Sequence, residues 1–202
     1  QKVMPHAIPV VSDSWTLDTL YGPHAAPGFL TVDYMETFFE AEWEVHYNSD
    51  RTGVRLLGPK PQWARPDGGE AGLHPSNLHD NPYAVGAVDF TGDMPVILGP
   101  DGPSLGGFAC PATVITADLW KLGQLRPGDR VQFQLVSHPE SLALLTCQED
   151  LISENSKRET ILSIPDRRPG DMKCVLESGR SKEDQWIIRQ SGDQNLLIEF
   201  GE

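Results

Sequence analysis

Short stretches in which apolar residues occupy every second position recur along the chain, and they limit the folds that it can adopt. About eight such segments are separated by turns rich in Gly, Pro, Asn and Asp, the pattern of half-buried β-strands. The expected strands lie at residues 15–21, 43–47, 54–57, 83–90, 94–98, 112–115 and 130–136, with two more within 186–201. With only two or three short helices, this pattern predicts a mainly β fold whose sheet closes into a barrel capped by helices.

Two helices are predicted inside this β pattern, each preceded by a threonine that can cap its N-terminus. Thr31 and Thr116 are these candidate caps, and Asp33 and Asp118 follow in the first turns, where a negative charge suits the helix dipole. A third helix is predicted after the last strand of the barrel, over residues 139–152.

Composition excludes several classes of partner. The formal net charge of −13 argues against binding to nucleic acid or to an anionic membrane surface, because both would repel the chain. No apolar run approaches the length of about 18 residues that a membrane span requires. The three cysteines are widely spaced and form no CxxC pair, so we expect neither a disulfide framework nor a zinc site, and a reducing, cytoplasmic compartment.

Polar residues with potential chemistry gather between two Gly-rich stretches. Residues 59–72 form a long Pro/Gly-rich loop, which is typical of functional or mobile segments. Residues 73–81 then contain two histidines, two asparagines and an aspartate. A metal site there is disfavoured, since the spacing of His74 and His79 fits no helical HxxxH pair, and hydrogen bonds to the backbone are the simpler reading. Gly106 and Gly107 allow a ligand or another strand to approach closely, or form a plain tight turn.

The segment GGEAGLHPSNLHDNPYAVGAVDFTGDMPVILGPDGPSLGGFACPATVITADLWKLGQLRPGD resembles the carboxyltransferase region of biotin-dependent urea carboxylases and urea amidolyases. The resemblance extends over residues 14–137 and includes allophanate hydrolase subunit 2 and the KipA proteins. The tail WIIRQSGDQNLLIEFG resembles the opening strands of a KipI-like module. The fold that this family implies is a cyclophilin-like closed β barrel, followed by a linker and a partial second β module.

The resemblance also implies an activity, the transfer of a carboxyl group from carboxybiotin to the nitrogen of urea or guanidine. Biotin would be presented by a separate carrier domain, and ATP and Mg²⁺ would act only at a biotin carboxylase domain. Such a reaction needs acceptors for NH₂ groups and donors for the moving carboxylate. We predict Asp89 and Asp93 as catalytic residues. The predicted substrate-binding residues are Asn77, His79, Asp80, Gly106, Gly107 and Phe108. Asp89 as an ionised acid would favour a guanidinium substrate.

The predicted organisation is that of a piece of a larger enzyme. Residues 1–137 correspond to the C-terminal part of a KipA-like module, 138–184 to a helix and linker, and 185–202 to the start of a KipI-like module. We expect such a chain to lack a complete active site on its own. The alternatives are a non-enzymatic KipA-like regulatory module and a subunit of a 5-oxoprolinase-type amidohydrolase.

Overall fold

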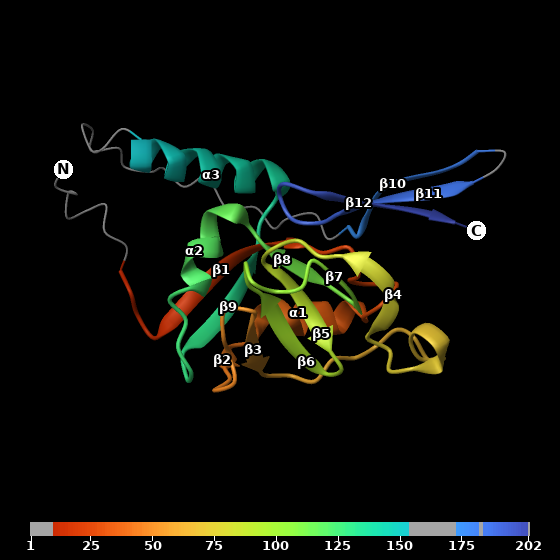
Figure 1. Ribbon diagram of the computed structural model, residues 1–202, viewed down its shortest axis with the longest axis horizontal. Helices are drawn as coiled ribbons and strands as arrows, with labels where there is room; N and C mark the ends of the chain where they lie inside the picture. Colours follow the sequence, from red (N-terminus) through yellow and green to blue (C-terminus); the bar gives the residue numbers. More distant parts are fainter. Residues whose placement is uncertain (1–9, 154–172, 182–183, 202) are drawn as a thin grey trace.

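Seven strands close into a barrel in the computed structural model, which describes residues 10–153, 173–181 and 184–201 (Figure 1). Around the barrel the order is β1-β8-β5-β6-β3-β2-β9. These strands are β1 (Ser14–Tyr21), β2 (Trp43–Val45), β3 (Gly53–Leu57), β5 (Ala87–Thr91), β6 (Met94–Leu98), β8 (Ala112–Val114) and β9 (Arg130–Leu135). The predicted mainly β fold with a closed barrel is confirmed.

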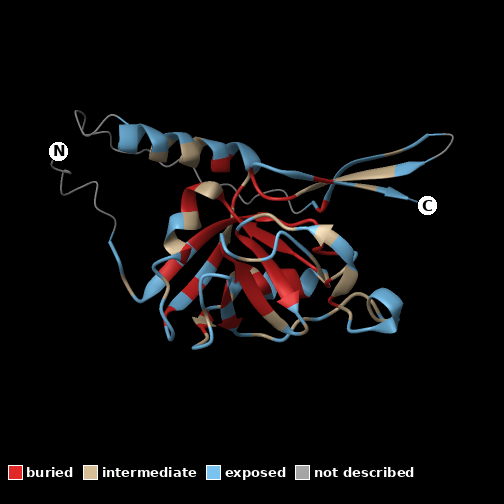
Figure 2. Ribbon diagram, in the orientation of Figure 1, coloured by how far each residue is buried: buried red, intermediate tan, exposed pale blue. Residues whose placement is uncertain are grey.

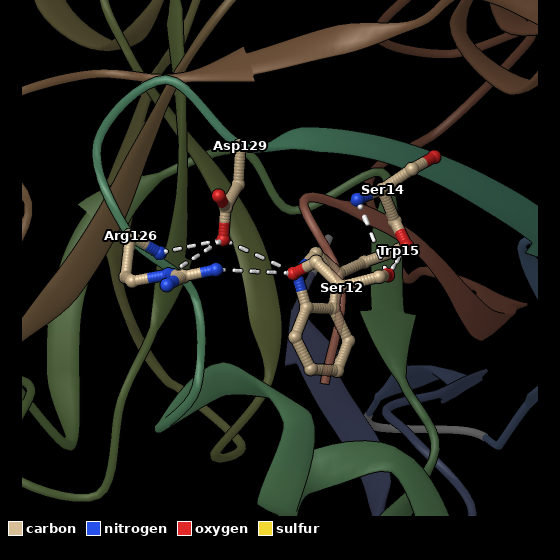
Figure 3. Close-up of polar contacts among 5 residues, drawn as sticks. All are labelled: Ser12, Ser14, Trp15, Arg126 and Asp129. Carbon is tan, nitrogen blue, oxygen red and sulfur yellow. Dashed lines mark hydrogen bonds and ion pairs between the residues drawn. The ribbon is translucent and has the colours of Figure 1, made fainter. Parts of the chain in front are cut away.

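The barrel closes where β1 and β9 run parallel, in register from Ser14↔Arg130 to Thr19↔Leu135. Asp129, buried at the end of the Pro-Gly-Asp turn that precedes β9, fixes this seam (Figure 3). Its Oδ2 accepts a hydrogen bond from Nε1 of Trp15 at 3.2 Å and another from the backbone N–H of Arg126 at 2.9 Å. The turn therefore contributes a side chain that joins the two strands as well as the backbone reversal.

Helix α1 (Val32–Glu40) packs its apolar side into the barrel. The predicted cap is confirmed, because Oγ1 of Thr31 accepts a hydrogen bond from the backbone N–H of Tyr34 at 3.2 Å. Phe38 is fully buried and stacks on Phe133 of β9, with ring centroids 4.8 Å apart. Figure 2 shows that most buried residues belong to the barrel, so this interior is the main hydrophobic core.

The second predicted cap is wrong. Thr116 opens the short 3-10 helix η3 (Thr116–Asp118), which leads into α2 (Leu119–Leu122), and its side chain caps neither. Instead its backbone N–H and hydroxyl both donate to the carboxylate of Asp193, at 3.0 and 2.8 Å. Thr116 therefore bonds to a residue 77 positions away in sequence. This long-range contact replaces the expected helix cap, and local sequence does not reveal it.

The predicted strand at 83–90 is also wrong in its extent. Strand β5 begins only at Ala87, since Gly86 has φ +85° and turns the chain before it. The residues before this turn form a different strand, β4 (Asn77–Pro82), which pairs antiparallel with β7 (Leu105–Phe108). These two strands make a separate small sheet beside the barrel.

Helix α3 (His138–Ser153) confirms the third predicted helix. It is followed by an antiparallel sheet of β10 (Val175–Arg180), β11 (Gln185–Gln190) and β12 (Leu196–Gly201). The two tail strands were predicted, and β10 lies within residues 138–184, the segment predicted as a helix and linker. Figure 2 shows that this helix and sheet are mostly exposed. The predicted linker lies largely outside the described residues, and the three module boundaries remain predictions.

Two further observations concern membrane spans and the cysteines. Within the ranges described, no helix combines the length and the apolar character needed to cross a membrane. The three cysteines, Cys110, Cys147 and Cys174, are free thiols.

Candidate functional site

All six residues predicted to bind substrate lie on the small β4–β7 sheet. Asn77, His79 and Asp80 are on β4, and Gly106, Gly107 and Phe108 are on β7. The register pairs Asn77 with Phe108 and places Asn81 opposite Gly106, whose carbonyl accepts a 3.0 Å hydrogen bond from the Asn81 amide. His79 and Asp80 are exposed. Residues 25 to 31 positions apart in sequence are thus brought together in one small sheet.

The glycine pair of β7 is explained by close packing. A Cβ atom at Gly106 would lie 2.6 Å from the ring of Tyr83, and one at Gly107 would lie 2.8 Å from the carbonyl oxygen of Leu78. The close approach of another strand therefore accounts for Gly107, and the Tyr83 ring accounts for Gly106.

Tyr83 is a residue of this region that the sequence analysis did not select. Its hydroxyl accepts a 2.7 Å hydrogen bond from the backbone N–H of Phe108, which ties the end of β4 to β7. Burial raises the pKa of Tyr83 well above its ordinary value, so the phenol stays neutral. The signal available in the sequence was an aromatic residue two positions after the polar run at residues 73–81.

Asp89 lies beneath this sheet, on the outer face of β5. Its neighbours in sequence, Val88 and Phe90, point into the barrel, so the carboxyl group points the other way. The residue is only 4% exposed, and its Oδ1 has no hydrogen-bond partner among the described residues. Burial raises the pKa of Asp89 to about 7, although Thr91 and Arg55 oppose this shift. Because Asp89 is buried, its predicted contact with substrate remains a prediction.

Asp93, the other predicted catalytic acid, lies in different surroundings. It is in the turn between β5 and β6, and its side chain is 46% exposed. Its Oδ1 accepts a hydrogen bond from Nε1 of Trp63 at 3.2 Å and lies 3.3 Å from Nε2 of His74 in an ion-pair contact. The structure therefore does not bring the two predicted acids together.

The hydrogen bonds of His74 determine which ring nitrogen carries the proton. The backbone N–H of Ser76 donates to Nδ1 at 3.2 Å, so that nitrogen must present a lone pair. The proton of the neutral ring is then on Nε2, the nitrogen that lies 3.3 Å from Oδ1 of Asp93.

Trp63 comes from the long loop at residues 59–72, which was predicted to be functional or mobile. The middle of this loop is held in place, because Thr31 N–H donates to the Gln62 carbonyl at 2.9 Å and Ala64 N–H donates to the Phe29 carbonyl at 2.9 Å. The indole ring packs edge-on against Phe90, with centroids 5.8 Å apart. The loop thus positions an aromatic side chain beside Asp93, a role that its irregular sequence did not reveal.

The chemistry available in this region is that of hydrogen bonding and proton transfer. Among the described residues there is no group of three or more His, Cys, Asp or Glu side chains that could hold a metal ion. His74 binds Asp93 and Ser76, whereas His79 is an exposed residue of β4. An oriented carboxylate beside an exposed polar sheet suits a small ligand that carries N–H groups.

Comparisons with known proteins identify a family and several relatives of this chain. A family model described as the carboxyltransferase domain, subdomain A and B, matches residues 1–135. The urea amidolyase of Lachancea kluyveri is 46% identical over 96% of this chain, and that of Saccharomyces cerevisiae is 43% identical over 100% of it. The crystal structure of the Kluyveromyces lactis urea carboxylase superposes with a TM-score of 0.90 at 45% identity, covering 98% of this chain.

These relatives are much longer proteins. The chain spans 11% of the length of each of the two amidolyases and 18% of the crystallised carboxylase chain. The resemblance noted in the sequence is confirmed, and it continues through the exposed C-terminal sheet. The model match over residues 1–135 and the identity along the whole chain show that this chain belongs to the carboxyltransferase domain family, subdomain A and B.

Proposed function

We propose that this chain is part of the carboxyltransferase component of a biotin-dependent urea carboxylase, in which a carboxyl group moves from carboxybiotin to a nitrogen of urea. The observation that carries the proposal is the likeness to the Kluyveromyces lactis urea carboxylase over 98% of this chain. It includes the barrel, the β4–β7 sheet and the C-terminal sheet together. The KipA-like regulatory and 5-oxoprolinase alternatives are less favoured, because the whole-chain matches are to urea amidolyases and urea carboxylases.

The polar surface of the β4–β7 sheet fits the ureido ring of biotin. That ring presents N–H donors and a carbonyl acceptor, and Asn77, His79 and Asp80 offer both kinds of partner on one strand. When bound, carboxybiotin supplies the activated carboxyl group. ATP and Mg²⁺ belong, in this proposal, to a biotin carboxylase domain of the larger enzyme.

Asp93 is the acid best placed to contact the acceptor substrate. Its Oδ1 is held by Trp63 and His74, and the exposed carboxylate retains lone pairs for an NH₂ group of urea. In the transfer, an N–H bond of urea breaks as the new N–C bond forms. The released proton ends on the biotin nitrogen that loses the carboxyl group, so no proton is gained or lost overall.

The state of Asp89 favours urea over guanidine. Pairing with a guanidinium ion would need an ionised, accessible carboxylate. Asp89 is buried, and its pKa of about 7 keeps a large share of it protonated near neutral pH. A neutral urea makes no such demand. We propose that Asp89 acts from beneath β7, by supporting the sheet.

A chimeric enzyme tests this function. Residues 14–201 of this chain replace the matching segment of the Kluyveromyces lactis urea carboxylase, and urea-dependent ATP hydrolysis and incorporation of labelled bicarbonate are measured. We expect turnover within about tenfold of the parent, and a loss of at least about tenfold (about 1.4 kcal/mol) in Asp93→Asn. The matched control is Asp101→Asn, an exposed acid paired with Arg51 beyond the other end of β6.

One result with the chimera would contradict the proposal. A chimera that folds and carboxylates its biotin but shows no turnover with urea would overturn it. Turnover with guanidine in place of urea would keep carboxyl transfer and replace the proposed substrate.

A further inference from the structure

A shallow hollow of about 280 Å³ lies on the rim of the barrel, where β3 ends and β6 begins. Its apolar lining includes Leu56, Met94 and Pro95, and its charged lining residues are Lys60 and Asp93. The volume is near the lower end of the range for small-molecule sites, about 300 Å³. The hollow is therefore suited to a small ligand with both polar and apolar surface.

The carboxylate of Asp93 is oriented by its own neighbours before any ligand arrives. Trp63 donates to Oδ1, and Nε2 of His74, whose N–H form is set by the backbone of Ser76, lies 3.3 Å from the same oxygen. Within the described ranges, both of these contacts use Oδ1, and Oδ2 has no hydrogen-bond or ion-pair partner. A ligand with an N–H donor gains a fixed acceptor there, at little cost in side-chain entropy.

Lys60 brings the opposite charge to the same hollow. Lys60 follows β3 and lines the hollow together with Asp93. The formal net charge of the chain is −13, so a positive charge at this place differs from the acidic character of the chain. The ammonium group attracts an anion, whereas the carboxylate attracts N–H donors. A ligand that satisfies both carries a carboxylate at one end and an amide NH₂ at the other.

We propose that this hollow binds the N-carboxylated urea, H₂N–CO–NH–COO⁻, with its carboxylate on Lys60 and its terminal NH₂ on Asp93. The inference rests on the proposed function, because carboxyl transfer to urea generates this molecule. The site includes Asp93, so the terminal NH₂ of the product stays on the same carboxylate that contacts urea in the proposed transfer. It serves the product after the new N–C bond has formed.

Malonamate is the probe for this site, since a CH₂ group replaces the reactive NH of the product and the ligand is stable. The indole N–H of Trp63 donates to Asp93 and is a local reporter in ¹H–¹⁵N spectra of the chain. We expect a saturable shift of the Trp63 signal, which a Trp63→Phe variant identifies. Neutral malonamide, which lacks the carboxylate, is expected to bind at least about tenfold more weakly.

Two variants separate the proposed contacts. Lys60→Gln is expected to weaken malonamate at least about tenfold and leave malonamide unchanged, whereas Asp93→Asn weakens both ligands. The control is Arg51→Gln, which removes an exposed positive charge before the other end of β3 and is expected to change neither affinity. Dispersed spectra of each variant verify folding.

Binding needs no turnover, so its outcome is independent of the chimera. No saturable shift with malonamate, or equal affinity in Lys60→Gln, would overturn this inference and leave the proposed function standing. Binding that depends on Lys60 together with an inactive chimera would support the site and overturn its assignment to the product of urea carboxylation.

Discussion

Asp193 holds Thr116 through both of its carboxylate oxygens, at 3.0 Å to the backbone N–H and 2.8 Å to the hydroxyl. The backbone carbonyl of Asp193 also accepts a 3.2 Å hydrogen bond from Nε2 of His138, the first residue of α3. The turn between β11 and β12 is thus joined to the segment after β8 and to the start of α3. These bonds attach the C-terminal sheet to the barrel.

Replacing Asp193 by Asn should weaken this attachment. The amide oxygen can replace only one carboxylate oxygen, so the hydroxyl of Thr116 must accept from the new NH₂ group, and exchanging two charge-assisted hydrogen bonds for neutral ones costs about 1–2 kcal/mol. We expect that loss in the free energy of unfolding measured with denaturant. Asp184→Asn, in the turn between β10 and β11, is the exposed control and should change stability by less than about 0.5 kcal/mol.

A double-mutant cycle with Thr116→Val tests whether the effect is specific. The two substitutions remove the same contact, so their combined cost should fall short of the sum by about 0.5 kcal/mol or more. Strict additivity would contradict the role assigned to the Asp193–Thr116 pair.

Asp129 gives a second prediction, on the closure of the barrel. Asp129→Ala leaves the indole N–H of Trp15 and the backbone N–H of Arg126 without their common acceptor (Figure 3). We expect a loss of about 2–4 kcal/mol, since two donors at a largely buried site lose their partner. Unfolding followed by tryptophan fluorescence measures it. Asp101→Ala breaks only an exposed ion pair and should cost less than about 1 kcal/mol, and an equal cost in both variants would argue against this account.

The closed barrel could be predicted because its signals are local. Apolar residues at every second position mark one buried face of a strand, and Val131 and Phe133 of β9 are buried as that pattern requires. The Thr31 cap is likewise contained within four residues of the helix that it begins. Elements whose structure depends on neighbouring residues could therefore be predicted from the sequence.

The features missed depend on distant partners. Thr116 is claimed by Asp193, and the glycines of β7 make room for Tyr83 and for the backbone of β4. The candidate site was partly predictable, because the polar run of β4 and the glycines of β7 do meet. That Asp89 is covered while Asp93 is exposed follows from the position of the β4–β7 sheet, which no local pattern encodes.

The buried carboxyl group of Asp89 makes stability depend on pH. In the folded chain burial raises the pKa of Asp89 from its ordinary value of 3.8 to about 7. Between these values the folded chain keeps a proton that the unfolded chain has lost, so the contribution of Asp89 to stability falls as pH rises from about 4 to about 7. Asp89→Asn, which cannot ionise, should therefore be close to the unmodified chain at pH 4–5 and more stable at pH 8, by about 2–4 kcal/mol.

The difference in the free energy of unfolding between Asp89→Asn and the unmodified chain isolates the contribution of Asp89 from that of the other titrating groups. Denaturant unfolding at several pH values gives the two stability curves, and their separation should widen with rising pH and level off above about pH 7. The exposed control Asp101→Asn should show no such widening. A constant separation for Asp89→Asn would mean that the carboxyl group ionises in the folded chain near its ordinary pKa.

The close packing of Tyr83 on β7 yields the last prediction. In Gly106→Ala the new methyl group would lie 2.6 Å from the Tyr83 ring, so the ring must shift and its hydroxyl must move away from Phe108 N–H. We expect a cost of about 1–3 kcal/mol and faster hydrogen exchange at the Phe108 amide, because that amide loses its acceptor. Gly28→Ala is the control, since nothing lies within 4 Å of a Cβ atom there. If Phe108 exchanged at the same rate in both variants, Tyr83 would not be the residue that holds the two strands of the site together.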